Sequence, residues 1–206
     1  MGSVRTDLRL GYSGTCHIKN GAAMRLKRED WLRIGLTQLA GKGAHGLSLE
    51  AMCAAADKTR GSFYHHFTDH DAFIEALMDH WLSENTIKVI NRLGTSEPIS
   101  HRREALNRIV AAFDHNIEVA VRRFAAANDT AQGVVHRADQ ARLDYLELLL
   151  SSGSAEPAAN LRMLVEIEYA MFVGYQTLFP NEAPEKYEAV GRMMDAMIGS
   201  VSGTQP

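Results

Sequence analysis

Residues 47–78 read LSLEAMCAAADKTRGSFYHHFTDHDAFIEALM, and this stretch decides the fold. A short apolar-periodic segment begins at Ser48 and ends near Ala55. A turn at residues 57–58 then leads into a second short segment rich in basic and hydroxyl side chains. A longer helical pattern follows from about residue 69. Two short helices around a tight turn form a helix-turn-helix, whose second helix enters the major groove of DNA. The stretch therefore predicts binding to duplex DNA.

The composition favours an all-α protein. The 206 residues are 46% hydrophobic, enough for a core, and include only 5 Pro. Ala, Leu, Met, Glu and Arg dominate, and these are good helix formers. We expect a three-helix helix-turn-helix domain at residues 24–70, with its motif at 48–67, and a C-terminal helical domain for ligand binding and dimerisation at 71–206. Residues 1–23 are expected to form a disordered arm, or to precede a native start at Met24.

Charge is distributed unevenly along the chain. Residues 1–66 contain 10 Lys and Arg against 5 Asp and Glu, whereas residues 67–206 contain 12 against 20. A basic front on an acidic body suits a protein that presents one end to phosphates. Two cysteines, Cys16 and Cys53, are too few for a disulfide framework and fit a reducing bacterial cytoplasm. No apolar run is long enough to span a membrane, so no membrane partner is expected.

Helical periodicity and capping residues predict the elements. Ser48 and Thr59 are expected to cap the two short helices, and Thr68 or Asp69 the long one that follows. Cys53 is expected as a buried thiol on the apolar stripe of the first short helix. The predicted helices cover about 27–41, 48–55, 60–66, 69–93, 102–117, 118–128, 130–150, 159–179 and 185–201, with a loop at 94–100.

The second short helix carries side chains that suit base edges and phosphates. Gly61 leaves the backbone bare at the point where the helix would approach DNA, and Phe63 and Phe67, four residues apart, anchor the inner face. Ser48 and the amides at the start of the preceding helix can hold a phosphate. The predicted DNA-contacting residues are Ser48, Lys58, Thr59, Arg60, Gly61, Ser62, Tyr64, His65 and His70.

The segments GSFYHHF at residues 61–67 and TDHDAF at 68–73 resemble the TetR family of bacterial transcriptional regulators. The resemblance covers roughly residues 27–81 and implies a dimeric DNA-binding protein, usually a repressor, released from a palindromic operator by a small ligand. Three residues depart from the family pattern. Asp57 replaces the usual turn glycine but tolerates left-handed geometry. Lys58 replaces a small apolar residue, and His70 replaces a lysine that contacts phosphate in many relatives, so this contact depends on the charge of the imidazole.

Less specific interpretations remain for these residues. Lys58 and Arg60 are each also compatible with solvated surface charges. His66 and His70 are four residues apart, but a helix break near Thr68 separates them and no Cys or Glu completes a metal site. We therefore expect no metal and no cofactor.

The last two helices are apolar on more than one side, which requires more than one neighbour. No charged residue occurs from Tyr169 to Phe179. Ala170 and Gly174, four residues apart, allow a close helix approach. We expect a homodimer built as a four-helix bundle from these helices, the alternative being a monomer that uses both faces in its own core.

A pocket for a small, largely apolar molecule is expected among the middle helices. Aromatic and Met side chains suit such a ligand, and His and Tyr can orient it. The candidate lining residues, each of which is also compatible with plain core packing, are Trp81, Phe113, His115, Phe124, His136, Tyr145, Met171, Phe172 and Tyr175.

Two functions follow from these patterns. The first is a cytoplasmic, ligand-responsive repressor, with activation of transcription left open. The alternative is a small helical enzyme or ligand carrier, for which Asp114 with His115, or His136 with Asp139, would form acid–base pairs. No nucleophile, phosphate loop or metal set completes an active site, so we expect a non-enzymatic protein. The effector and the operator sequence are not specified.

Overall fold

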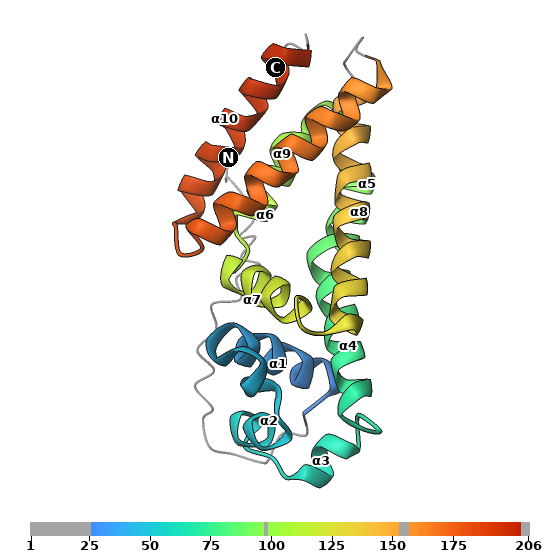
Figure 1. Cartoon of the computed structure of the whole chain (residues 1–206), viewed down its shortest axis with the longest axis vertical. Coiled ribbons are helices and arrows are strands. Elements are labelled where there is room, and N and C mark those ends of the chain that lie inside the picture. Colours follow the sequence, from blue (N-terminus) through green and yellow to red (C-terminus); the bar gives the residue numbers. More distant parts are fainter. Residues whose placement is uncertain (1–25, 97–98, 153–156, 203–206) are drawn as a thin grey trace, which may run out of the picture.

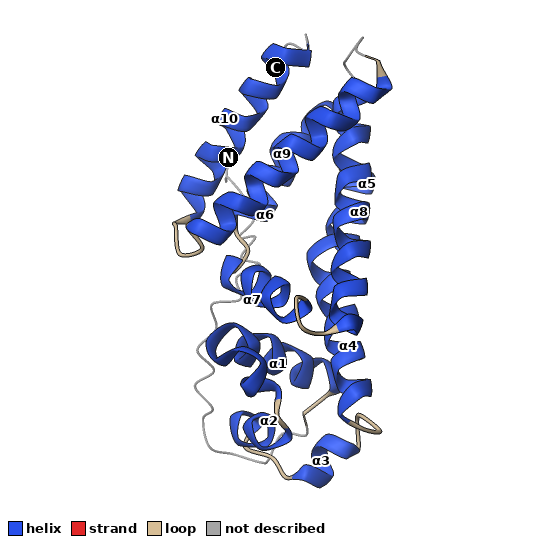
Figure 2. Ribbon diagram, viewed as in Figure 1, coloured by secondary structure: helices blue, strands red, loops and turns tan. Residues whose placement is uncertain are grey.

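The structure is a computed structural model that describes residues 26–96, 99–152 and 157–202. Every regular element among these residues is helical, which confirms the all-α expectation (Figure 2). Their bounds, with η1 a 3-10 helix and η2 a π-helix, are α1 (Arg28–Lys42), η1 (Gly43–Leu47), α2 (Leu49–Ala56), α3 (Arg60–Tyr64), α4 (His70–Leu82), η2 (Ser83–Ile87), α5 (Lys88–Ser96), α6 (Ile99–Ala111), α7 (His115–Ala125), α8 (Asp129–Ser151), α9 (Ala158–Leu178) and α10 (Pro184–Ser202).

The molecule is elongated (Figure 1). The helices α1, α2 and α3 lie at one end, and α9 and α10 lie side by side toward the other. The helices α4 and α8 run along the long axis and pack against each other, while α7 crosses between the two ends. None of the described helices is long and apolar enough to cross a membrane.

Side-chain caps fix the starts of α2, α3 and α4, as the sequence predicts. The hydroxyl of Ser48 accepts a hydrogen bond from the amide of Ala51 at 3.3 Å, and that of Thr59 accepts one from Ser62 at 3.4 Å. Asp69, rather than Thr68, caps α4, with its carboxylate 2.7 Å from the amide of Ala72. Each cap satisfies an amide that has no partner within the helix.

The turn of the motif depends on one residue in a left-handed conformation. Asp57 has φ 50° and ψ 49°, the only positive φ of a non-glycine residue among those described. The amide of Lys58 donates to the carbonyl of Cys53 at 3.0 Å, which closes the end of α2. The interpretation of Asp57 as a tolerated replacement for glycine is thus confirmed.

An aromatic cluster holds α3 in place. Phe63 and Phe67 are buried, as predicted, and their ring centroids lie 5.1 Å apart. Phe63 also meets Trp31 of α1 at 5.4 Å and Phe73 of α4 at 5.2 Å. The same core continues into α7 and the first half of α8, so the helix-turn-helix end is not a separate packing unit. Cys53 is half-buried, not buried as expected, because it packs against the outside of this core and not within it.

Three predicted boundaries are wrong. The long helix does not run unbroken to residue 93, because a π turn interrupts it at Ser83–Ile87 before α5 continues to Ser96. The predicted loop at 94–100 is therefore mostly helical. The break between the middle helices falls before His115 rather than after residue 117, because Asp114 accepts a hydrogen bond from the amide of Asn116 at 3.0 Å and caps α7. The predictions for residues 1–23 and for Cys16 lie outside the described residues.

Candidate nucleic-acid interface and cavity

The helix α3, together with its capping residues Thr59 and His65, presents most of the predicted DNA-contacting residues at the surface. Phe63 points into the core, whereas Arg60, Gly61, Tyr64 and His65 are exposed on the end of the molecule formed by α2 and α3 (Figure 1). The structure thus brings together the residues that were predicted in this helix. Exposed positions on one short helix that is anchored from behind are the geometry that major-groove reading requires.

Arg60 makes a surface ion pair with α2. Its Nη2 lies 2.5 Å from a carboxylate oxygen of Glu50, and both side chains are about two-thirds exposed. Such exposed pairs contribute little to stability, so the guanidinium can exchange this partner for a phosphate or a base. Lys58 is half-buried, as expected for a stem that packs while its amine reaches solvent, and Ser62 is also half-buried.

His70 and His66 tie the motif to neighbouring backbone instead of binding a common ion. Nε2 of His70 lies 2.9 Å from the carbonyl oxygen of Leu47, and Nε2 of His66 lies 3.0 Å from that of Leu26. A carbonyl only accepts, so each Nε2 carries a proton. Ser48, next to Leu47, is exposed beside His70 at the start of α2. Within the described residues no group of three His, Cys, Asp or Glu side chains could hold a metal ion.

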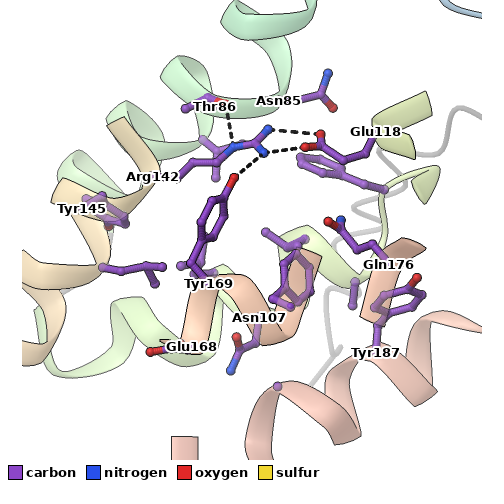
Figure 3. A pocket seen from close by; sticks show the side chains of 18 of the residues that line it. Asn85, Thr86, Asn107, Glu118, Arg142, Tyr145, Glu168, Tyr169, Gln176 and Tyr187 are labelled. Carbon is purple, nitrogen blue, oxygen red and sulfur yellow. Dashed lines mark hydrogen bonds and ion pairs between the residues drawn. The ribbon is translucent and has the colours of Figure 1, made fainter. Parts of the chain in front are cut away.

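A cavity lies between α6, α7, α8, α9, α10 and the η2 turn. The cavity has a volume of about 110 Å³. Its wall is mostly apolar and aromatic, with a few polar groups (Figure 3). This space exceeds the roughly 10–15 Å³ that a single water needs, so the cavity can accommodate a small ligand.

The structure places three of the nine predicted lining residues on the cavity wall, namely Phe113, Tyr145 and Phe172. His115 lies behind the wall, stacked on the lining residue Tyr187 at 3.7 Å, and Trp81 is fully buried beneath Arg142. The remaining four do not line the cavity either: Phe124 packs on the N-terminal core, His136 is exposed on α8, Met171 is half-buried on α9, and Tyr175 packs against the lining residue Tyr187 at 5.3 Å.

A buried charge network, which the sequence did not reveal, forms one side of the cavity (Figure 3). Arg142 of α8 binds the Glu118 carboxylate at 2.7 Å and the Tyr169 hydroxyl at 3.1 Å. Arg122 binds the same Glu118 at 3.0 Å and Asp139 at 2.6 Å, and the Tyr169 hydroxyl donates to Asp139 at 2.7 Å. Two guanidinium and two carboxylate groups leave the network neutral.

The shifted pKa values of the two carboxyl groups in this network favour their charged forms. Burial alone would raise the pKa of Glu118, but Arg142 and Arg122 lower it. Burial likewise opposes ionisation of Asp139, and the hydrogen bonds from Arg122 and Tyr169 hold its pKa below the usual range. Burial raises the pKa of the Tyr169 hydroxyl to about 12. The network is therefore ionised, with a neutral tyrosine, at physiological pH.

A second cluster lies at the α10 side of the cavity. Arg103 of α6 binds Glu168 of α9 and Asp195 of α10, each at 2.5 Å, and the Asn107 amide donates to Asp195 at 2.7 Å. A Cβ at Gly191 would lie 2.9 Å from the side chain of Asn107, so this glycine lets α10 approach α6. Two carboxylates share one guanidinium here, which leaves an excess negative charge.

The acid–base pairs of the enzyme alternative do not assemble. Asp139 is engaged by Arg122 and Tyr169, whereas His136 is exposed. His115 is buried, and its Nδ1 lies 2.8 Å from the side-chain nitrogen of Gln176. Burial lowers the pKa of His115 to about 4, so its ring is neutral, and a neutral ring that accepts at Nδ1 has its proton on Nε2.

The helix-turn-helix end matches a known family. Residues 32–77 match the model of bacterial regulatory proteins of the tetR family, which spans α1 to α4. No curated protein matches the sequence.

Solved structures resemble the fold over most of the chain. A transcriptional regulator from Rhodococcus sp. Rha1 has a TM-score of 0.70 at 15% identity, covering 88% of this chain and 100% of that one. AibR, solved in complex with isovaleryl coenzyme A and operator DNA, has a TM-score of 0.61 at 16% identity, covering 86% and 99%. The ketosteroid transcriptional regulator KstR2 of Mycobacterium tuberculosis has a TM-score of 0.59 at 15% identity, covering 89% and 97%.

Proposed function

The chain is a DNA-binding transcriptional regulator of the tetR family, and on this premise we propose that it is a ligand-responsive repressor that binds a palindromic operator as a homodimer. The observation that carries the proposal is the exposed face of α3, held from behind by Phe63. Two such helices in a two-fold dimer enter successive major grooves about one DNA turn apart. AibR, of similar fold, was solved with both an acyl coenzyme A and operator DNA.

The proposed DNA contacts divide by their chemistry. Arg60 and Tyr64 of α3 reach base edges and neighbouring phosphates once Arg60 exchanges its ion pair with Glu50. Ser48, at the start of α2, holds a phosphate together with backbone amides. His70 is exposed at this end, and because its Nε2 donates to the Leu47 carbonyl, its proposed phosphate contact uses Nδ1.

The homodimer forms through the last two helices. Six of the nine large hydrophobic side chains that are exposed in the described residues lie on α9, on α10 or at the C-terminal end of α9. Met163 and Ile167 follow one face of α9, and Met193 and Met197 follow one face of α10. Gly174 has open space in front of its missing Cβ, which allows a partner helix to approach. An exposed apolar surface of this kind marks an interface between proteins.

The dimer is tested by analytical ultracentrifugation at micromolar concentration. The wild type is expected to sediment as a dimer, and the double variant Met163→Glu with Met193→Glu as a folded monomer. Leu148→Glu is the matched control, since this exposed apolar residue lies on α8. It should remain dimeric. A monomeric wild type would contradict the proposed interface.

The effector binds in the cavity and acts on the DNA-binding end through α4 and α7. Asn85 and Thr86 of the η2 turn line the cavity, and the same helix continues back into α4. Glu118 lines another side of the cavity, and the helix that carries it, α7, packs against α1. An effector that prefers one arrangement of these helices shifts the population toward it and thereby changes DNA affinity.

Gel-shift titration of the wild type against the DNA upstream of its own gene tests the function. We expect a specific complex that resists a large excess of unrelated DNA and whose affinity falls steeply with salt, as released counterions require. Equal affinity for unrelated DNA of the same length at every salt concentration would refute the proposal of an operator-binding regulator.

A further inference from the structure

We propose that the effector of this cavity is a small, largely apolar amine whose ammonium group is held by Glu168. The inference rests on the proposed function, because it takes the cavity as the effector site. The inference follows from the charge of the cavity wall and from the hydrogen-bonding groups of the wall that have no partner.

Most of the hydrogen-bonding groups that remain available on the cavity wall are acceptors. The side-chain nitrogen of Asn107 donates to Asp195, and the side-chain nitrogen of Gln176 is bonded to His115. The side-chain oxygens of Asn107 and Gln176, which both line the cavity, have no hydrogen bond within the described part of the chain. Glu168 is 8% exposed, and its Oε2 has no hydrogen-bond partner there. A buried acceptor without a partner is costly, and a ligand N–H group supplies the missing donor.

The strong donors of the wall are already engaged, except for the Tyr145 hydroxyl, which has no hydrogen-bond partner in the described residues. Arg142 directs its nitrogens to Thr86, Glu118 and Tyr169. The hydroxyl of Tyr187 donates to the carbonyl of Phe179 at 2.9 Å. The guanidinium nitrogen Nη1 of Arg103 also has no partner in the described residues, but Arg103 does not line the cavity. A carboxylate ligand would therefore find only the Tyr145 hydroxyl as an unpaired donor and would lie near the negative charge of Glu168, whereas an ammonium group would meet unpaired acceptors.

Charge favours a cation over a neutral donor. Glu118, Arg142 and Glu168 are the acidic and basic residues on the wall. Glu118 and Arg142 belong to the neutral network, whereas Glu168 shares Arg103 with Asp195, so one negative charge is uncompensated. Burial raises the pKa of the Glu168 carboxyl despite the opposing effect of Arg103, and a bound cation would stabilise its ionised form. Phe172 and Tyr187 add aromatic faces that attract cations.

Isothermal titration calorimetry with three probes of matched size tests the inference. The probes are 3-phenylpropan-1-amine, 3-phenylpropan-1-ol and 3-phenylpropanoate, which share one apolar body and differ in the polar group. The amine should bind the wild type at least about tenfold more tightly than the alcohol, since hydrogen bonds between charged groups are stronger, and the carboxylate should bind most weakly.

Two variants of α9 locate the charge that the amine recognises. Glu168→Gln keeps the shape of the side chain and one acceptor oxygen. It should reduce the preference for the amine over the alcohol to less than about threefold, because only a hydrogen bond to a neutral acceptor remains. Glu166→Gln, two residues away and more than half exposed, should keep the full preference. If Glu168→Gln does not fold, the order of the three probes on the wild type decides by itself.

An alcohol or carboxylate that binds as tightly as the amine, or an amine that does not bind measurably, overturns the inference. These outcomes leave the specific DNA complex of the wild type unchanged, so they are distinct from a failure of the proposed function. That failure would appear as loss of specificity in the gel shift without any probe present.

Discussion

The Nε atom of Arg142 donates a 3.0 Å hydrogen bond to the hydroxyl of Thr86, which ties α8 to the π turn that follows α4. The same guanidinium lies 5.3 Å from the ring of Trp81, one turn earlier, and binds Glu118 on α7. One side chain therefore joins the cavity wall to both helices that contact the DNA-binding end. π turns are frequent at functional sites.

Replacing Arg142 should destabilise the protein strongly. In Arg142→Met the carboxylate of Glu118 loses one of its two guanidinium partners and Thr86 loses its donor, so the free energy of unfolding should fall by about 3 kcal/mol. Urea denaturation measures this. Arg137→Met on the same helix removes an exposed pair with Asp79 and should change stability by less than about 1 kcal/mol. Equal effects of the two substitutions would mean that the network does not stabilise the fold.

Gly61→Ala should separate stability from DNA binding. The nearest atom to an added Cβ would be the Thr59 hydroxyl at 3.8 Å, so the methyl group fits and the helix gains up to about 1 kcal/mol. DNA affinity should nevertheless fall at least about tenfold if the bare backbone of α3 lies against DNA. In Gly133→Ala on α8 the added Cβ meets no atom within 4 Å, so this variant should gain stability without a change in DNA affinity. Unchanged operator affinity in Gly61→Ala would place the DNA surface elsewhere.

His115 should make stability depend on pH. Its pKa is lowered by burial from 6.5 to about 4. Between these pH values the imidazole is therefore protonated in the unfolded chain and neutral in the folded protein. Stability is therefore lost as the pH falls from about 6.5 toward 4, and this group contributes about 2 kcal/mol of that loss between pH 7 and pH 5. Denaturation at both pH values should show a smaller difference for His115→Phe than for the wild type. The substitution His136→Gln, at an exposed position, should leave the difference in stability between the two pH values unchanged. If His136→Gln removed this difference, His115 would not be its source.

The turn residue Asp57 should be sensitive to branching at Cβ. Its φ of 50° is strained for most side chains, so Asp57→Val should lower the free energy of unfolding by about 1–2 kcal/mol. Asp57→Gly should leave it within about 0.5 kcal/mol, because greater freedom of the unfolded chain offsets the relief of strain. A valine variant as stable as the wild type, measured by thermal denaturation, would show that the turn can relax.

Local signals explain which features the sequence predicted. The caps Ser48 and Thr59, the left-handed Asp57 and the buried Phe63 and Phe67 all depend on residues a few positions apart, and all are present. Each is a short-range rule of helix starts, turns or apolar spacing. The exposed residues of α3 that we propose as DNA contacts could be chosen for the same reason.

The cavity could not be predicted in this way. Arg142 meets Glu118 across 24 positions and Arg103 meets Asp195 across 92, distances over which a sequence pattern carries no pairing information. Glu118 and Arg122 are four apart on one helix, a pattern that also describes an ordinary exposed pair. Aromatic residues were a partial guide, since Phe113, Tyr145 and Phe172 line the cavity whereas His136 faces solvent.

The role of α3 is tested most directly by fluorescence anisotropy on the upstream DNA fragment with the double variant Arg60→Ala and Tyr64→Ala. Both side chains are exposed, so the fold should survive, and circular dichroism checks that it does. Arg137→Ala is the control for loss of an exposed arginine far from α3. We predict that specific binding falls at least about a hundredfold in the double variant and is unchanged in the control. Full operator affinity in a folded double variant would contradict the assignment of α3 as the helix that reads DNA.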